Sequence, residues 1–244
     1  MKNILILTPQ IPYPPRQGAS MRNYYIIKGL AQNNRVSLLT FKEDNQSTDP
    51  EKIAPLLTLC GQRVYTVDVP QRATADRLRA MLTSSYPDMG HRLYDEAFNQ
   101  LLTQLITDEL FDIIQIEGIE LARTMPLIRQ FSPESMIVFD NHNAETELQR
   151  RALQTDWRKP QRWAGAIYSA VQVVKLSRFE AWACETADAV TVVSAADADH
   201  LRMLVPNLKA TAIPNCIDID MYAGVQPTED KRFDLVFTGK MDYR

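Results

Sequence analysis

Short apolar runs alternate with stretches of helical periodicity along most of the chain. The first run, Asn3–Pro9, is continuously apolar, as expected of a strand that a parallel sheet buries on both faces. Six later runs of similar character predict further strands. They lie at Arg35–Phe41, Arg63–Val69, Phe111–Gly118, Ser135–His142, Ala189–Ser194 and residues 209–215.

Helical patterns fill the intervals between these runs. Ser20 is the expected N-cap of a helix in which Met21, Tyr25 and Leu30 repeat at helical spacing. The same periodicity predicts helices at about Thr74–Ser84, Tyr94–Glu109, Trp163–Glu185 and Ala195–Leu204. Strands and helices that alternate in this way predict an α/β fold with a doubly wound, Rossmann-like parallel sheet over residues 3–214.

The last part of the chain breaks the alternation. Residues 223–232 combine Gly, Pro and charged side chains and predict a linker. Phe233–Thr238 is apolar again and leads into Gly239, as at the start of another α/β unit. We therefore interpret residues 1–222 as one domain and residues 233–244 as the first strand of a truncated second domain.

Composition and charge narrow the class of protein. The 244 residues are 45% hydrophobic and 23% charged, which is ordinary for a soluble globular chain. A net charge of -3 gives no global attraction to nucleic acid. Cys60, Cys184 and Cys216 lie far apart, so neither a disulfide framework nor a metal-binding pair is indicated. With no signal-peptide core and no apolar run of membrane-spanning length, a cytoplasmic location is expected.

Polar residues gather where ligands of an open parallel sheet bind, beyond the carboxyl ends of the strands. The loop Thr8–Ser20 places Gly18 before a helix whose N-terminus can hold an anion. This loop has no GxGxxG pattern. The alternative is that Gly18 serves only to form the turn. Because Asp140–Glu145 also follows a strand, we expect the two loops to adjoin at one edge of the sheet.

Three side chains at that edge are candidates for a site, each with a structural alternative. His142 and Asn143 follow one strand, and Glu117 ends another. A single histidine is as often structural as functional, and Glu117 has a simpler role as a capping or solvated carboxylate. No pair among His91, His142 and His200 has metal-ligand spacing. We therefore expect no metal site.

Five segments together resemble the retaining GT-B glycosyltransferases of glycosyltransferase family 4. They are ILILTPQIPYPPRQGASMRNYYIIKGLAQNNRVSLLTF, FDNHNAETELQRRA, FEAWACETADAVTVVSAADADHL, AIPNCIDIDMY and LVFTGKMDYR, in this order. The similarity covers essentially the whole chain. One departure is Cys216, where that family usually has a glycine.

The resemblance implies a function and an arrangement of domains. GT-B enzymes place two Rossmann-like domains across a cleft, and this chain would supply the N-terminal, acceptor-side domain. It implies sugar transfer from a nucleotide-diphosphate sugar to a glycan, lipid or small-molecule acceptor, with retention, without a metal or other cofactor. Such transfer fits the biosynthesis of cell-surface polysaccharide. The chain alone is expected to be inactive, because most of the donor-binding domain would lie beyond Arg244.

The same resemblance assigns roles to individual residues. Gly18 and Lys240 match positions near the donor diphosphate, and Arg22 is a further substrate-binding candidate. His142 matches the histidine beside the transferred sugar, where we expect it to form a hydrogen bond with sugar or acceptor. Glu117 and Asn143 are expected to line the cleft. Two alternatives remain, a GT-B sugar-nucleotide epimerase and a non-catalytic acceptor-binding domain.

A basic and aromatic segment suggests a further partner. Residues 149–163 contain a single acid, Asp156, among five cations and two tryptophans. These are Arg150, Arg151, Arg158, Lys159 and Arg162, with Trp157 and Trp163. This composition suits peripheral contact with an anionic membrane surface, here the inner face of the membrane. The alternative is a solvated loop followed by a helix whose tryptophans pack into the domain. Nucleic acid is not expected.

Overall fold

The computed structural model describes residues 1–224 and forms one parallel sheet in that part of the chain. The strand order is β3-β2-β1-β4-β5-β6-β7. The strands are β1 (Asn3–Thr8), β2 (Arg35–Lys42), β3 (Val64–Asp68), β4 (Ile113–Glu117), β5 (Met136–Asn141), β6 (Ala189–Val192) and β7 (Ala210–Ala212). All seven predicted strands are confirmed, as is the doubly wound, Rossmann-like α/β class.

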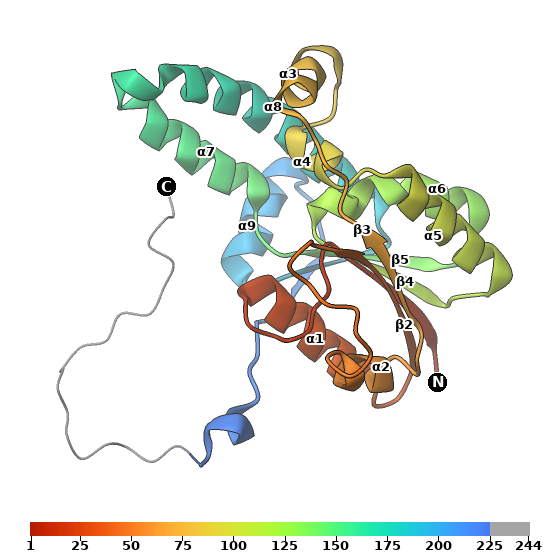
Figure 1. Cartoon of the computed structure of the whole chain (residues 1–244). Coiled ribbons are helices and arrows are strands. Elements are labelled where there is room, and N and C mark those ends of the chain that lie inside the picture. Colours follow the sequence, from red (N-terminus) through yellow and green to blue (C-terminus); the bar gives the residue numbers. More distant parts are fainter. Residues whose placement is uncertain (225–244) are drawn as a thin grey trace, which may run out of the picture.

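Helices cover both faces of this sheet (Figure 1). On one face lie α1 (Gly18–Leu30) and α2 (Ala54–Leu59), and on the other lie α5 (Glu96–Asp108) and α6 (Met125–Phe131). The remaining helices are α3 (Thr74–Thr83), α4 (Asp88–Arg92), α7 (Glu145–Trp157), α8 (Trp163–Thr186) and α9 (Ala195–Leu204). Short 3-10 turns occupy η1 (Ile119–Thr124), η2 (Pro160–Arg162) and η3 (Ile219–Tyr222).

The central strand explains why the apolar runs are continuous. Ile6 of β1 packs in the cluster that contains Ile27 of α1, whereas Leu7 packs in the cluster that contains Leu102 of α5. All four side chains are fully buried. Successive residues of a strand point to opposite faces, so a strand between two helical layers must be apolar at every position.

Helix α1 begins at Gly18, two residues before the predicted N-cap Ser20. Ser20 still closes the helix start, because its hydroxyl accepts a hydrogen bond from the backbone N–H of Gln17 at 3.0 Å. The hydroxyl of a Ser at the third helical position can satisfy a free donor there, much as a capping box does. The prediction therefore found the right residue and gave it the wrong position.

The sequence prediction missed α2, α4, α6 and α7. The most consequential is α7, where we expected a loop. Its residues are mostly polar, and acids in its first turn, Glu145 and Glu147, favour a helix start electrostatically. Packing on α8 supplies the remaining stabilisation, which sequence periodicity does not show.

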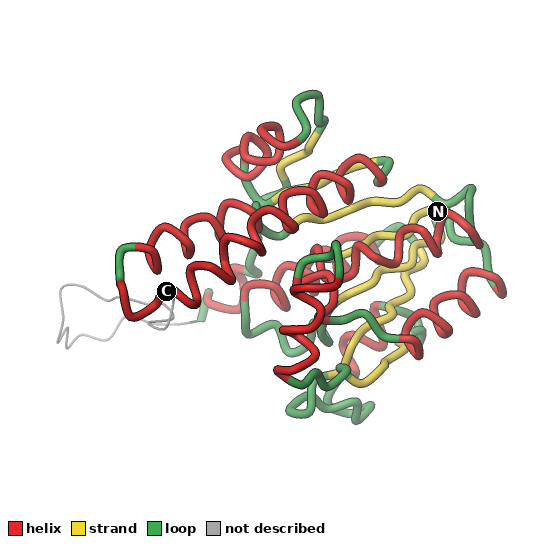
Figure 2. The backbone as a smooth tube through the Cα atoms, turned by 90° about the horizontal axis from the view of Figure 1, so that it is seen from above, coloured by secondary structure: helices red, strands yellow, loops and turns green. Residues whose placement is uncertain are grey.

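Helices α7 and α8 form an antiparallel hairpin that reaches away from the sheet (Figures 1 and 2). No helix in the described part of the chain combines the length and apolarity required to cross a membrane. The predicted strand Phe233–Thr238 and the site residue Lys240 lie outside the described residues, as does almost all of the predicted linker.

Candidate functional site

A cavity of about 170 Å³ opens where the winding of the sheet reverses direction. The chain proceeds from β1 to β2 and β3 on one side, and continues through β4 to β7 on the other. Residues from the ends of β1, β2, β4 and β5 line the cavity, together with Ala19 of α1 and His142. Open α/β sheets bind ligands at such a switch point. The expected meeting of the Thr8–Ser20 and Asp140–Glu145 loops is confirmed.

Beneath the cavity, Arg22 and Asp140 form a buried ion pair. Arg22 Nε and Nη2 each donate to one oxygen of the Asp140 carboxylate at 2.7 Å. Arg22 Nη1 donates to the carbonyl of Ile213 at 2.6 Å and to Asn215 Oδ1 at 3.1 Å. Burial favours a neutral carboxyl, but the hydrogen bonds from Arg22 hold the pKa of Asp140 below its usual value. The pair joins α1, β5 and the segment after β7.

His142 is held by a second buried carboxylate. Its Nε2 lies 2.8 Å from Glu117 Oε2 and 3.7 Å from Asp140 Oδ2. The buried amide of Asn23, with its nitrogen turned toward the acceptors, donates to Glu117 Oε2 at 2.9 Å. The structure thus brings Glu117 and His142 together, and the pair fixes the imidazole orientation from below.

Protonation of this pair is tuned by its surroundings. Burial, and then the charge of Asp140, raises the pKa of Glu117 to about 7. Burial disfavours the imidazolium and by itself would lower the pKa of His142. The hydrogen bond and the charge of Glu117 outweigh this effect, together with the charge of Asp140, and raise the pKa of His142. Both shifts favour the protonated forms of Glu117 and His142.

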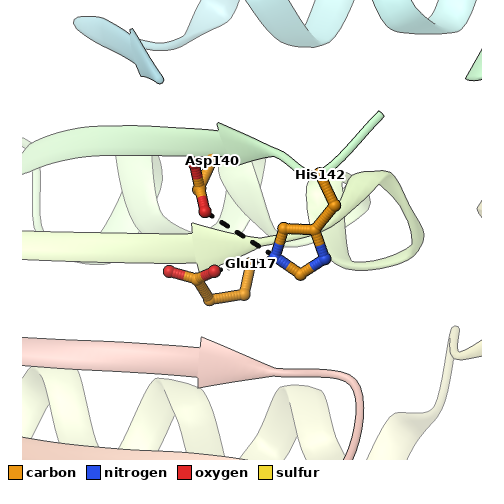
Figure 3. A group of neighbouring side chains, drawn as sticks. All are labelled: Glu117, Asp140 and His142. Atoms are coloured by element: carbon orange, nitrogen blue, oxygen red, sulfur yellow. Dashed lines mark hydrogen bonds and ion pairs between the residues drawn. The ribbon is translucent and has the colours of Figure 1, made fainter. Parts of the chain in front are cut away.

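Glu117, Asp140 and His142 also converge closely enough to consider a metal ion (Figure 3). Their ligand atoms lie within 4.8 Å of one another. However, the guanidinium of Arg22 already binds both oxygens of Asp140, and His142 shares its Nε2 with Glu117. Because a cation bound there would face the Arg22 charge, we interpret the group as a hydrogen-bonded network.

A match to a family model decides the family. Residues 17–216 match the family model of the glycosyl transferase 4-like domain. The chain belongs to the glycosyl transferase 4-like family. No curated protein matches the sequence.

Solved structures agree with this fold. UGT89C1 of Arabidopsis thaliana complexed with UDP has a TM-score of 0.50 at 12% identity, over 90% of this chain and 50% of that chain. The catalytic domain of starch synthase IV from Arabidopsis thaliana, bound to ADP and acarbose, has a TM-score of 0.49 at 14% identity. This match covers 91% of the present chain and 53% of the starch synthase chain. The Rossmann-like fold of this chain is similar to that of UGT89C1. The chain spans about half the length of these structures.

In the glycosyl transferase 4-like domain, the turn that carries His142 is positioned from α8. Glu180 is fully buried, and its carboxylate accepts from Asn141 Nδ2 at 2.9 Å. The same carboxylate accepts from the backbone N–H groups of Glu145 at 2.9 Å and Thr146 at 3.1 Å. Glu180 therefore satisfies the first donors of α7 and fixes both ends of the His142 turn. The side chain of Asn141 is buried at the cavity, and its Oδ1 has no hydrogen-bond partner among the described residues.

Gly118 follows β4 and brings the backbone close to the cavity. Its φ is 87°, a conformation that favours glycine. Its N–H donates to the carbonyl of Asp140 at 3.0 Å. A Cβ atom at this position would lie 3.0 Å from Glu120 Oε2 and 3.9 Å from His142 Nδ1. Another residue at this position would strain the backbone and would require Glu120 to shift.

The rim of the cavity is acidic. Glu43 follows β2, Glu120 pairs with Arg92 at 3.4 Å, and Glu145 accepts from Asn143 Nδ2 at 3.0 Å. Burial is the main cause that raises the pKa of Glu145 to about 7. The carboxylates and amides of this rim are suited to a ligand rich in hydroxyl groups.

A second, larger cavity of about 510 Å³ adjoins the first. The two share Gln10 and Glu43, and the larger one continues along Tyr13, Arg16 and Gln17. The N-terminus of α1 lies between them, since Gln17 and Ser20 line one cavity and Ala19 the other. Together they provide space for a ligand larger than one sugar ring.

The predicted site residues have different surroundings. Glu117, His142 and Asn143 all contribute to the cavity or to its buried support. Gly18 starts α1 as expected, but nothing lies within 4 Å of a Cβ built on it, so packing does not require glycine there. Arg22 is only 3% exposed, and its donors are engaged by protein acceptors. Lys240 lies outside the described residues.

Sequence reasoning missed several residues of the cavity. Glu43 and Glu120 each follow the end of a predicted strand by two residues, so their position at the strand ends was the available signal. Arg92 lies on α4, far from any predicted strand, and no sequence pattern indicated it. Glu180 lies in the middle of a long helix, where its role depends on a turn that is distant in sequence.

Proposed function

We propose that this chain is the acceptor-side half of a GT-B glycosyltransferase that transfers a sugar from a nucleotide-diphosphate sugar. The observation that supports this most is the Glu117–His142 pair beneath a polar cavity at the switch point of the sheet. Membership in the glycosyl transferase 4-like family supports the reaction class. Because the chain is about half as long as the structures it matches, the reaction needs the second domain of the complete protein.

His142 would bind the sugar at the reacting centre. With Nε2 on Glu117, Nδ1 is the ring nitrogen left to meet a ligand in the cavity. Although burial opposes it, the hydrogen bond with Glu117 raises the pKa of His142 and so favours the imidazolium form. In that form Nδ1 would donate a hydrogen bond to a sugar oxygen, and the buried carboxylate would stabilise the imidazolium. A hydrogen bond of this kind stabilises charge that develops in the transition state.

The acceptor would enter over the acidic rim and the larger cavity. The carboxylates and amides of the rim, Glu43, Glu120, Asn143 and Glu145, would accept and donate hydrogen bonds to ligand hydroxyl groups. We infer a polyhydroxylated acceptor, free or linked to a lipid, as in the assembly of a cell-surface polysaccharide. Phosphate groups would be held elsewhere, because Glu43, Glu120 and Glu145 line the rim.

The donor would be bound chiefly by the second domain. UGT89C1 binds UDP, which supports a nucleoside diphosphate as the leaving group here. Lys240 and the N-terminus of α1 near Gly18 would contact the diphosphate, since free N–H groups and a cation stabilise its charge. In this proposal the leaving group needs no metal, and retention follows the family resemblance.

Product analysis tests this function directly. The complete protein is incubated with UDP-, GDP- and ADP-sugars and a mixture of oligosaccharide and lipid-linked acceptors, and the products are separated. We expect nucleotide release coupled to a new glycosidic bond. A changed sugar nucleotide without transfer would instead indicate an epimerase, in which Glu117 and His142 move a proton. Binding of an acceptor without turnover would leave a non-catalytic domain.

Calorimetry of this chain tests whether the donor is bound by these residues or by a second domain. We expect no sub-millimolar binding of UDP- or GDP-sugars to residues 1–244 alone. Tight donor binding by this chain would show that the acceptor-side assignment is wrong.

A further inference from the structure

Helix α8 exposes an apolar stripe along the face that points away from the sheet. Trp163, Ile167, Val171 and Val174 recur at helical spacing, and between 36% and 61% of each residue is exposed. We call these four residues the α8 stripe. The opposite side of α8 is buried, as Leu176 shows at 2% exposure. An ordinary surface helix is polar on its outer face, so a helix that is apolar on both faces indicates an interaction surface.

Two tryptophans meet at the end of the hairpin. Trp157 ends α7 and is 61% exposed, and Trp163 begins α8 and is 55% exposed. The indole N–H of Trp163 donates to the carbonyl of Trp157 at 3.3 Å. The alternative arrangement, in which both tryptophans pack into the domain, is therefore wrong. Because the hairpin reaches away from the sheet (Figures 1 and 2), its end can approach a flat surface.

The end of the hairpin also carries unpaired positive charge. Arg158 and Lys159 are exposed, and neither side chain has an ion-pair partner in the part of the chain that the structure describes. The other three cations of this segment are paired, one with Asp156 and two with Glu147. Two cations therefore lie beside two exposed tryptophans, and no carboxylate among residues 1–224 forms an ion pair with them.

Helix α3 extends the apolar surface next to α8. Lys175 of α8 donates to the carbonyls of Met81 at 2.5 Å and Ser84 at 2.7 Å, which holds α3 against α8. Leu78 and Leu82 of α3 are 51% and 79% exposed. Helix α3 has no buried residue at all. A helix that has no fully buried residue and exposes leucines is suited to burial against another surface.

We propose that the α7–α8 hairpin docks on an anionic lipid surface. The α8 stripe lies in the boundary between headgroups and acyl chains, with Trp157 and Trp163 at the level of the headgroups. Arg158 and Lys159 contact the lipid phosphates. Tryptophan prefers the membrane interface, and each cation near an anionic leaflet strengthens binding. This inference does not depend on the proposed enzymatic function.

A second copy of the chain is the main alternative occupant of the stripe. A dimer through the α8 stripe would bury apolar area, but it would leave Arg158 and Lys159 without a counter-charge from the stripe. An anionic lipid surface satisfies the apolar residues and the cations together. The lipid surface is therefore the occupant that the combined features favour.

Vesicle sedimentation of the 244-residue chain tests the proposal. Vesicles of phosphatidylcholine with phosphatidylglycerol are compared with vesicles of phosphatidylcholine alone. The variants are Arg158→Gln with Lys159→Gln for the charges, and Ile167→Ser for the stripe, with Val174→Ser as a second stripe variant. Matched controls are Lys209→Gln, an exposed cation elsewhere, and Leu110→Ser, at a residue that is 84% exposed. Circular dichroism verifies that each variant folds.

We expect the chain to sediment with the anionic vesicles and much less with the neutral ones. The charge variant and either stripe variant should each lower the vesicle partition coefficient by roughly tenfold, and the controls should leave it unchanged. Absence of vesicle binding, or binding that neither kind of variant weakens, would overturn the proposal. So would a dimer in sedimentation velocity that Ile167→Ser dissociates while vesicles bind nothing.

Discussion

The guanidinium of Arg22 donates two hydrogen bonds of 2.7 Å to the carboxylate of Asp140, and both side chains are buried. Arg22 lies on α1 and Asp140 on β5, so the pair connects two elements that form the candidate site. Burial, and then the charge of Asp140, raises the pKa of Glu117, which pairs with Asp140 on the adjacent strand. One ion pair thus supports both the fold and the protonation of the Glu117–His142 pair.

Loss of Arg22 should destabilise the domain strongly. Arg22→Met leaves the Asp140 charge buried without the guanidinium that neutralises it, and we expect the free energy of unfolding in urea to fall by about 3–5 kcal/mol. Arg22→Met combined with Asp140→Asn should recover part of this loss. Arg151→Ala is the control, because Arg151 forms an exposed pair with Glu147 that contributes less than about 1 kcal/mol. Equal losses for Arg22→Met and Arg151→Ala would contradict the structural role of the pair.

Glu180 should stabilise the His142 turn from a distance. Glu180→Ala removes the acceptor of three buried or half-buried donors, and we expect a loss of about 2–4 kcal/mol of unfolding free energy. Hydrogen exchange of the Glu145 and Thr146 amides should also accelerate. Glu185→Ala, at an exposed position of the same helix, should change neither quantity. Unchanged exchange at the α7 start in Glu180→Ala would show that Glu180 does not hold the turn.

Two glycines provide a matched pair of substitutions. Gly118→Ala forces a Cβ into a site where φ is 87° and Glu120 is 3.0 Å away, so we expect a loss of about 1–2 kcal/mol. Gly29→Ala lies within α1, where a Cβ meets nothing within 4 Å. It should stabilise the protein by up to about 1 kcal/mol. Thermal unfolding of both variants measures the difference. Destabilisation by Gly29→Ala would contradict the open space around the Cβ position of Gly29.

Stability should decrease as the pH rises through neutrality. The folded chain raises the pKa of Glu145 from 4.5 to about 7, so between these values it binds more protons than the unfolded chain. The contribution of this carboxyl to the free energy of unfolding is complete below pH 4.5 and is lost as the pH rises through about 7. The pKa values of Glu117 and His142 are also raised, so these groups also lower the stability as the pH rises.

Glu145→Gln isolates one part of this dependence. At about pH 5 the variant and the parent chain should have similar unfolding free energies, since the parent carboxyl is protonated there. At about pH 8 the variant should be more stable by about 1 kcal/mol or more, because it carries no buried charge. Urea unfolding at both pH values measures the difference. Parallel pH profiles would mean that Glu145 titrates normally.

Sequence reasoning found the sheet because its strands are continuously apolar over short runs, as in Asn3–Pro9. It found the Asp140–Glu145 loop because that loop follows a strand in a parallel sheet. It missed α7, since a polar helix stabilised by packing on α8 has no apolar periodicity of its own. Arg22 was identified from a motif, but its four hydrogen bonds come from residues 118 to 193 positions away. Partners that distant are set by the fold and leave no local pattern.

The exposure of the hairpin was also beyond sequence reasoning. The composition of residues 149–163 indicated a basic and aromatic segment, but both a packed and an exposed arrangement agreed with it. Only the structure shows that Ile167 and Val174 continue the exposed face beyond Trp163. Helical spacing alone predicts which residues share a face, but it does not predict which face the domain covers.

The measurement that tests the account most directly is the turnover of nucleotide sugar by the complete protein with His142→Ala. We expect turnover to fall at least tenfold, which corresponds to about 1.4 kcal/mol of transition-state stabilisation. Thermal stability should be close to that of the parent protein, and His200→Ala, on α9 and outside the cavity, should leave turnover unchanged. Parent-like turnover in His142→Ala with normal stability would contradict the assignment of the Glu117–His142 pair as the sugar-binding centre.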